Sequence, residues 1–183
     1  MNIFYIDPDP EICAQYHNSK HVVKMILEQA QLLSTAHRVL DGKEVVLKSK
    51  TNRNVKRWIL NDIRENILYS ASHVNHPSAV WCRQSKTNYL WLVELTVALC
   101  KEYTYRYGKT HKCEQIGLVE LLKTPPQNIP VGLFTEPIPA MDEKYKVPNN
   151  SLESYRKYYR EGKKHLAKWS GKINSRPVPN WFF

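Results

Sequence analysis

The chain has 183 residues, and 27 Lys and Arg against 17 Asp and Glu give it a formal net charge of +10 at pH 7. Apolar residues make up 42% of the sequence, which excludes a disordered chain. Its apolar runs fall far short of the about 20 residues that cross a bilayer, and no signal-peptide pattern is present. We therefore expect a cytoplasmic, intracellular protein without membrane contact, with one domain over residues 1–183.

The beginning of the chain predicts a short extended segment followed by one long helix. Residues 2–6 suit an extended segment, and Asp9 followed by Pro10 is typical of an N-cap with proline at the first helical position. The helical pattern then continues to the turn signal at Asp41-Gly42. A helix of roughly 30 residues is long for a globular protein, so we expect a kink or a break near Ser34-Thr35.

A polar stripe on this predicted helix is the main catalytic candidate. His17, His21, Lys24 and Glu28 follow one another at i, i+4, i+7 and i+11, a spacing that places all four on one helical face. Apolar residues occupy the adjoining faces, as in a helix that lines a cleft. A base, an acid and an amine on a rigid element can perform general acid–base or Schiff-base chemistry. The alternative is a surface stripe with a Lys24–Glu28 ion pair.

Residues 45–60 predict a β-hairpin with a polar turn around residues 51–54. The segment 43–57 holds six Lys and Arg against one Glu, a local charge of +5. Such a cluster is typical of a phosphate-binding surface, and the alternative is a solvated basic face without a partner. The residues of this segment that we expect to bind nucleic acid are Lys48, Lys50, Arg53, Lys56 and Arg57.

The middle of the chain predicts a short helix over 61–72 and a long central helix that begins at Pro77 and ends at Gly108. His73 and His76 stand just before the central helix, and we expect them to bind phosphate or to cap the helix. With His17 and His21 they also suggest a divalent metal site, but no H-E-x-x-H motif is present and neighbouring lysines would oppose a cation. We therefore expect neither a metal nor another cofactor.

The last third of the chain predicts a helix over 111–123, a long loop over 124–148 and a final helix over 151–169. The loop holds six prolines and shows no periodic pattern. Long ordered loops of this kind are often functional, and we interpret this one as a strap or lid. Together the elements predict a mainly α fold: a single compact helical domain with a short N-terminal extended segment, a small basic β-hairpin and a long proline-rich loop.

Residues 142–183 form the second basic segment, with ten Lys and Arg against four Asp and Glu, a local charge of +6. Its helix interleaves tyrosines with cations, which suits nucleic acid because bases stack on rings while cations neutralise phosphates. The alternative is that the tyrosines pack on the core, as we expect for Tyr155 and Tyr159. The nucleic-acid contacts expected here are Arg156, Lys157, Arg160, Lys163, Lys164 and Trp181.

The four cysteines suggest no disulfide framework. Cys13, Cys82, Cys100 and Cys113 contain no C-x-x-C pair. Three of them lie in helical patterns among apolar residues. We therefore expect reduced thiols that behave as small buried apolar side chains.

Three stretches of the chain carry a resemblance to a known family. They are the Cys-Ala-Gln-Tyr-His of residues 13–17, the Asn75-His76 that leads into the central helix, and the Tyr/Lys-rich last helix followed by Arg176-Pro177 and Trp181. In these the chain resembles the small phage pyrimidine-dimer DNA glycosylases of the endonuclease V type, and it also looks like proteins of marine phages. The resemblance implies an all-α DNA repair enzyme of an infected host cell that bends the duplex, extrudes a base and cleaves its glycosidic bond.

The sequence departs from that family at the groups that carry the reaction. The family's nucleophile is the α-amine of the processed N-terminal residue, whereas Asn2 here is large and Met1 is expected to be retained. Lys24 stands near the position of the family's catalytic Glu, with Glu28 one turn later. Lys24 as the amine and Glu28 as the acid and base would rebuild the machinery. The other outcome is a changed or lost activity.

We therefore expect a DNA-binding hydrolase of the glycosylase type that acts on a damaged or modified base of a DNA duplex, with Glu28 and His21 handling protons. Two alternatives stay open. One is a nucleotide hydrolase or transferase whose histidines bind metal or phosphate. The other is a non-catalytic protein that binds DNA, RNA or a small phosphorylated ligand.

Overall fold

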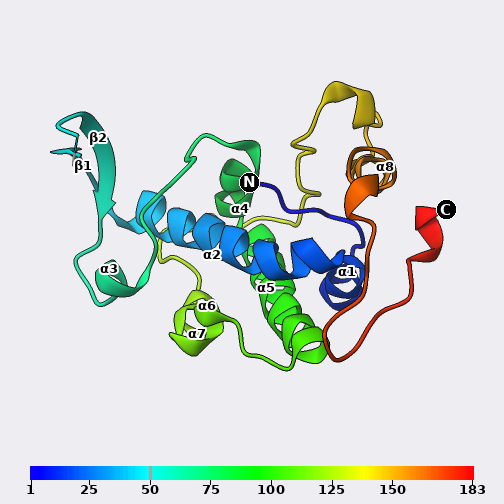
Figure 1. The fold of residues 1–183 in the computed structure, drawn as a ribbon. Coiled ribbons are helices and arrows are strands. Elements are labelled where there is room, and N and C mark those ends of the chain that lie inside the picture. Colours follow the sequence, from blue (N-terminus) through cyan, green and yellow to red (C-terminus); the bar gives the residue numbers. More distant parts are fainter. Residues whose placement is uncertain (50) are drawn as a thin grey trace.

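The computed structural model describes residues 1–49 and 51–183, so Lys50 of the predicted nucleic-acid contacts lies outside the described residues. The fold is mainly α with one two-stranded antiparallel hairpin, as predicted (Figure 1). The helices and strands are α1 (Pro10–Tyr16), α2 (Ser19–Asp41), β1 (Lys43–Lys48), β2 (Asn54–Ile59), α3 (Arg64–Ile67), α4 (Pro77–Gln84), α5 (Lys86–Tyr107), α6 (Lys112–Gln115), α7 (Leu118–Leu122) and α8 (Ser151–Lys157).

Helix α5 lies at the centre of the packing. Helices α1, α2, α4 and α7 all contact it, and α2 crosses it near the middle of the molecule (Figure 1). Leu92, Leu95 and Leu99 follow one another at helical spacing on α5 and are fully buried. The buried apolar side chains, all four cysteines among them, form one hydrophobic cluster. None of the helices in the described ranges is both long and apolar enough to cross a membrane.

The predicted first helix is broken at His17 and Asn18. His17 has extended backbone with ψ of 132°, and the Asn18 side chain accepts a hydrogen bond from the N–H of His21 at 2.9 Å, which starts α2. Asn is among the strongest N-cap residues, so it begins a new helix here. The break expected near Ser34-Thr35 does not occur, because α2 runs without interruption through both residues.

The predicted central helix is broken in the same way at Ser85. This residue has φ of −149°, and its hydroxyl accepts from the N–H of Asn88, so it ends α4 and caps α5. Gly108, at φ of 64°, ends α5 in the left-handed conformation that glycine tolerates, as predicted. The helices predicted over 61–72 and 111–123 are shorter than expected, and Gly117 at φ of 74° divides the second into α6 and α7.

The proline-rich loop is an ordered strap across α4 and α5, which confirms the interpretation of residues 124–148. The indole N–H of Trp81 donates to the carbonyl of Thr135 at 2.8 Å, and the N–H of Lys86 donates to the carbonyl of Pro130 at 2.8 Å. Near its other end the loop accepts a hydrogen bond from the Asn2 side chain on the carbonyl of Ala140. These contacts fasten the loop along its length.

The final helix is shorter than predicted, because regular α-helix ends at Lys157. A turn of π-helix follows over Tyr158–Gly162 and a 3-10 turn over Lys164–Leu166. A Cβ atom on Gly162 would lie 2.5 Å from the Tyr158 ring, so only glycine fits beneath this turn. The chain then runs back over the body to the 3-10 turn Asn180–Phe182 at its end (Figure 1).

Candidate functional site

Glu28 is the point at which the N-terminal segment meets α2. Its carboxylate lies 3.0 Å from Nζ of Lys24, one turn earlier on the helix. The same carboxylate accepts a hydrogen bond from the backbone N–H of Asn2 at 3.3 Å. The side chain of Glu28 is 14% exposed and that of Lys24 is 69% exposed. A rigidly held carboxylate thus stands at the surface with an amine beside it.

An unusual backbone conformation at Phe4 directs the N-terminal segment to Glu28. Phe4 has φ of 56°, which is rare for a bulky residue and costs about 1–2 kcal/mol. Its ring is buried and stacks on the His21 ring, with centroids 4.1 Å apart and planes 25° apart. Asn2 is held in turn by its bond to the Ala140 carbonyl at 3.0 Å. Core packing therefore holds the segment beside α2.

The turn before α4 brings histidines to the same region. Burial lowers the pKa of His76, the nearby α-amino group of Met1 and the charge of His73 lower it further, and Glu28 acts in the opposite direction. Nδ1 of His76 accepts from the N–H of Ser78 at 3.2 Å, so His76 caps α4, one of its two expected roles. His73 is exposed and has φ of 50°. The structure thus places His76 within electrostatic reach of Glu28.

His17 and His21 are core residues. His17 precedes α2, so the prediction that it shares a helical stripe with the other three is wrong. Nδ1 of His17 lies 2.7 Å from the Cys13 carbonyl oxygen, and Nδ1 of His21 lies 2.6 Å from the hydroxyl of Tyr159. Burial lowers the pKa of His17 to about 4 and that of His21 to about 2. Both are neutral at pH 7, and both rings pack against Phe4 of the N-terminal segment.

The arginines of the C-terminal region hold chain segments together. Arg156 donates to the Ile6 carbonyl at 3.0 Å, pairs with Asp7 at 3.3 Å, and places its guanidinium 5.2 Å from the Trp181 ring centroid. Arg160 pairs with Glu153 and donates to the Trp181 carbonyl. Lys157 donates to the carbonyl of Lys144 at 2.8 Å. These predicted nucleic-acid contacts, and the half-buried Trp181, are all engaged within the chain.

A tyrosine–lysine cluster, formed by Tyr145, Tyr158 and Lys163, lies against the N-terminal segment. The Tyr145 and Tyr158 rings are 4.9 Å apart, and Nζ of Lys163 lies 4.9 Å from the Tyr158 centroid. Tyr158 also stacks on Phe4 at 6.1 Å. Lys164, the next predicted contact, is exposed. The cluster is far from Glu28 in the sequence, whereas in the structure both contact residues 2–4. Tyr145 was not among the predicted site residues.

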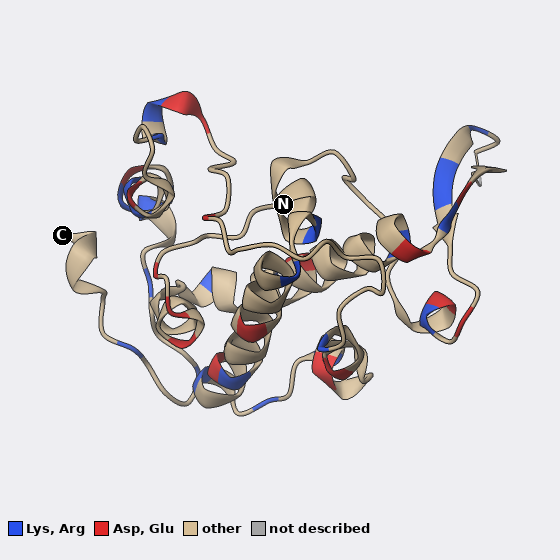
Figure 2. Cartoon of the chain, turned by 180° about the vertical axis from the view of Figure 1, so that it is seen from behind, with Lys and Arg blue, Asp and Glu red and all other residues tan. Residues whose placement is uncertain are grey.

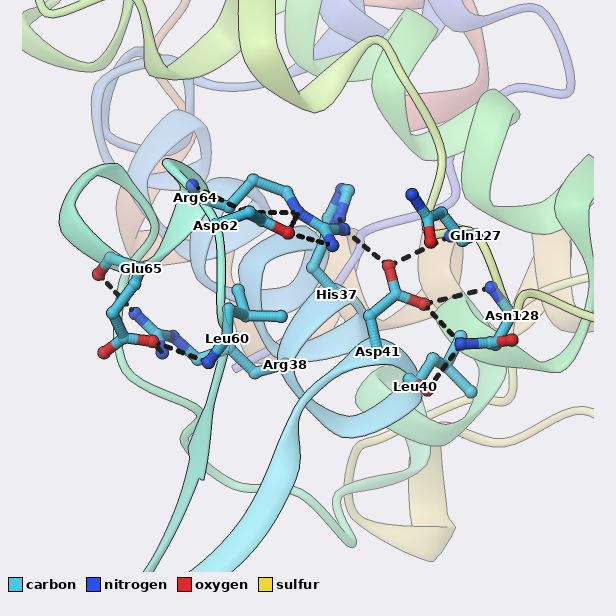
Figure 3. Close-up of polar contacts among 10 residues, drawn as sticks. All are labelled: His37, Arg38, Leu40, Asp41, Leu60, Asp62, Arg64, Glu65, Gln127 and Asn128. Atoms are coloured by element: carbon cyan, nitrogen blue, oxygen red, sulfur yellow. Dashed lines mark hydrogen bonds and ion pairs between the residues drawn. The ribbon is translucent and has the colours of Figure 1, made fainter.

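A second polar network lies at the C-terminal end of α2 and was not predicted (Figure 3). Arg64 pairs with Asp41 and with Asp62 at 2.7 Å and lies 3.0 Å from Nδ1 of His37. Burial lowers the pKa of His37 to about 4, and the Arg64 charge adds to this. Asp41 also accepts from the backbone N–H groups of residues 127 and 128. Because its charges are paired within the chain, we interpret this network as structural.

The basic residues of the hairpin are mostly open to solvent. Lys48, Arg53 and Lys56 are exposed, and Arg57 is half-buried. Lys56 pairs with Glu44 at 2.8 Å, an exposed pair that contributes little. Figure 2 shows basic segments along the hairpin and around α8. Among the described residues, no carboxylate lies within ion-pair distance of Lys48 or Arg53.

Two surface cavities lie away from Glu28. One of about 460 Å³ lies between α1 and α5, where Pro10, Val93 and Lys101 line it. Another of about 420 Å³ lies beside Arg64 and Leu121. Within residues 1–49 and 51–183, no group of three or more His, Cys, Asp or Glu side chains is arranged to hold a metal ion.

No protein-family model matches the chain, and no curated protein and no solved structure matches it either. The function therefore rests on the chemistry of the Lys24–Glu28 region and of the surfaces around it.

Proposed function

We propose that this protein binds DNA and acts as a glycosylase on a damaged or modified base, with Lys24 as the attacking amine and Glu28 as the acid and base. The observation that carries the proposal is the contact of 3.0 Å between Lys24 Nζ and the Glu28 carboxylate, at a position that solvent reaches. An amine with a positioned proton acceptor is the combination that nucleophilic catalysis at a sugar carbon needs.

The reaction uses only these two side chains. Glu28 takes a proton from the Lys24 ammonium, and the neutral amine attacks C1′ of the extruded nucleotide. The new N–C1′ bond forms as the bond from C1′ to the base breaks, and Glu28 returns its proton to the departing base. Glu28 then takes a second proton from the nitrogen and passes it to O4′ as the C1′–O4′ bond breaks, which opens the sugar ring and leaves a protonated Schiff base. The proton balance closes on a single carboxylate.

The surroundings of Glu28 support a nucleic acid as the substrate. Lys163 lies over the Tyr158 ring, Tyr158 stacks on Phe4 of the N-terminal segment, and Asn2 of the same segment binds Glu28. A cation and half-buried tyrosine rings on the N-terminal segment that binds Glu28 are suited to phosphates and unstacked bases. Extrusion of the base would bring C1′ of its nucleotide to the exposed Lys24 side chain.

Borohydride trapping on duplexes that carry a panel of modified bases tests the proposal. We expect a covalent adduct whose peptide map places the DNA on Lys24. We expect Lys24→Gln to abolish the adduct and Glu28→Gln to slow base release by about 10²-fold or more. Lys20→Gln, an exposed lysine one turn earlier on α2, is the matched control and should react normally.

The outcomes separate the alternatives. An adduct on the amine of Met1 would keep the reaction class and overturn the role of Lys24. DNA binding with neither an adduct nor base release across the panel would leave a non-catalytic binding protein and overturn the enzymatic proposal.

A further inference from the structure

The hairpin of β1 and β2 projects from the body of the molecule. It leaves the C-terminal end of α2, and both strands contact each other and that end of the helix (Figure 1). Each strand has six residues, so the hairpin reaches about 20 Å. Its side chains are almost all exposed or half-buried, in contrast to the packed helices.

The base of the hairpin is fixed rather than hinged. Arg38 is 4% exposed, donates to the Trp58 carbonyl at 2.9 Å and pairs with Glu65 at 2.7 Å (Figure 3). Glu65 in turn accepts from the N–H of Leu60, directly after β2, at 2.8 Å. A Cβ atom on Gly42 would lie 2.5 Å from the Arg38 carbonyl oxygen of α2 and 3.2 Å from the Ile59 carbonyl oxygen of β2, so helix and strand approach closely at this glycine. The hairpin therefore has a set direction.

Cationic and apolar side chains are mixed over both faces of the hairpin. In the antiparallel register Val46 stands opposite Lys56, and Leu47 stands opposite Val55. Val46 is 60% exposed and Leu47 is 47% exposed, although both are apolar. A ribbon meant to pack on a protein core would gather its apolar residues on one face. This mixture instead suits a partner that offers charge and apolar surface within one groove.

The charge decides between a second copy of the chain and a polyanion. The segment 43–57 has a net charge of +5, so two such hairpins would repel each other. The major groove of B-form DNA is about 12 Å wide, admits a two-stranded ribbon, and is flanked by phosphates. The deep, narrow major groove of A-form RNA does not admit side chains.

We infer that the hairpin is an arm that enters the major groove of B-form duplex DNA. Lys48 and Arg53 contact phosphates at the rims of the groove, and Val46, on the same face of the ribbon as Lys48, faces base edges. The inference rests on the proposed DNA binding and deepens it, because it names B-form duplex as the form of the substrate. It also gives the hairpin a role separate from the Lys24–Glu28 pair.

Binding measurements on matched double variants test the arm. We would measure the affinity of Lys48→Ser/Arg53→Ser for a DNA duplex of about two helical turns and for duplex RNA of the same sequence, over a range of salt. The control is Lys109→Ser/Lys112→Ser, which removes the same charge from two exposed lysines outside the hairpin. The slope of log affinity against log salt is negative. We expect its magnitude to decrease by about 2 in the hairpin variant and to stay unchanged in the control.

Binding in the major groove is detected as protection of guanine N7 from methylation, because this atom lies in the major groove. Wild-type protein should protect N7 positions, should bind DNA at least about tenfold more tightly than the RNA duplex, and should lose both properties in the hairpin variant. Equal binding of RNA, absent N7 protection, or a hairpin variant that behaves like the control would overturn the arm. A borohydride adduct that forms normally in that variant leaves the glycosylase proposal standing, whereas hairpin-dependent DNA binding without an adduct overturns only the catalytic proposal.

Discussion

The hairpin and the C-terminal region carry nearly the same charge, +5 over residues 43–57 and +6 over residues 142–183, but they use it differently. In the hairpin, Lys48 and Arg53 are exposed. In the C-terminal region, Arg156 pairs with Asp7 and Arg160 pairs with Glu153, whereas Lys164 is exposed. Local net charge thus does not tell whether a cation is available. A cation that bonds to the chain stabilises the fold, whereas an exposed one is left for a phosphate.

Among single substitutions, the largest expected effect concerns Arg106, which anchors the C-terminal region to α5. Arg106 is fully buried, pairs with Glu102 at 2.6 Å, donates to the carbonyls of residues 15 and 17, and accepts from the N–H of Ile173 on its own carbonyl. Arg106→Met leaves the Glu102 carboxylate in the core with only Arg176 as a partner. We expect a loss of about 3–5 kcal/mol in the free energy of unfolding, measured in urea.

The hairpin offers the matched control for that variant. Arg53→Met removes an arginine from an exposed position and should change the unfolding free energy by less than about 0.5 kcal/mol. Equal losses in the two variants would break the distinction between structural and available cations.

Acid is also expected to destabilise the fold, because His17, His21 and His37 are buried. Burial lowers the pKa of His17 and of His37 to about 4, and that of His21 to about 2. In the unfolded chain each histidine takes up a proton near pH 6.5, while the folded state stays neutral, so protons favour unfolding. The stability present above pH 6.5 is therefore lost as the pH falls toward 4.

Urea unfolding between pH 7 and pH 5 measures this loss. Each of the three histidines contributes up to about 1.4 kcal/mol per pH unit below pH 6.5. A His17→Gln/His37→Gln variant should show a shallower dependence, whereas His165→Gln, at an exposed position of the C-terminal region, should keep the wild-type slope. Stability that holds or rises on acidification would show that these rings are not buried in the neutral form.

Local signals were enough to predict several elements of the fold. The Asp9 cap with Pro10, the left-handed Gly108 and the hairpin all depend on residues next to one another in the chain. The helix breaks could not be predicted in this way, because the helical pattern continues through them. The break at Asn18 is fixed by a bond of 2.7 Å from the N–H of Ser19 to the Lys168 carbonyl, and the Ser85 hydroxyl donates to the Leu133 carbonyl. Both partners lie far away in the sequence.

In the candidate site, too, local contacts could be predicted from the sequence and long-range contacts could not. The Lys24–Glu28 pair is an i, i+4 contact on one helix, so the sequence predicts it. The approach of Asn2 to Glu28 depends on the left-handed backbone of Phe4, which no local preference of phenylalanine favours. The contact between the Tyr145 and Tyr158 rings depends on the path of the proline-rich loop and on the π-helical turn that begins at Tyr158. Periodicity carries no information about either.

The salt dependence of binding to one DNA duplex, compared between two double variants, tests the central claim most directly. Lys48→Ser/Arg53→Ser removes two exposed cations of the hairpin, and Arg156→Gln/Arg160→Gln removes two paired cations of the C-terminal region. We predict that the magnitude of the slope of log affinity against log salt decreases by about 2 in the hairpin variant and is unchanged in the C-terminal variant. A slope that falls equally in both, or only in the C-terminal variant, would contradict the account.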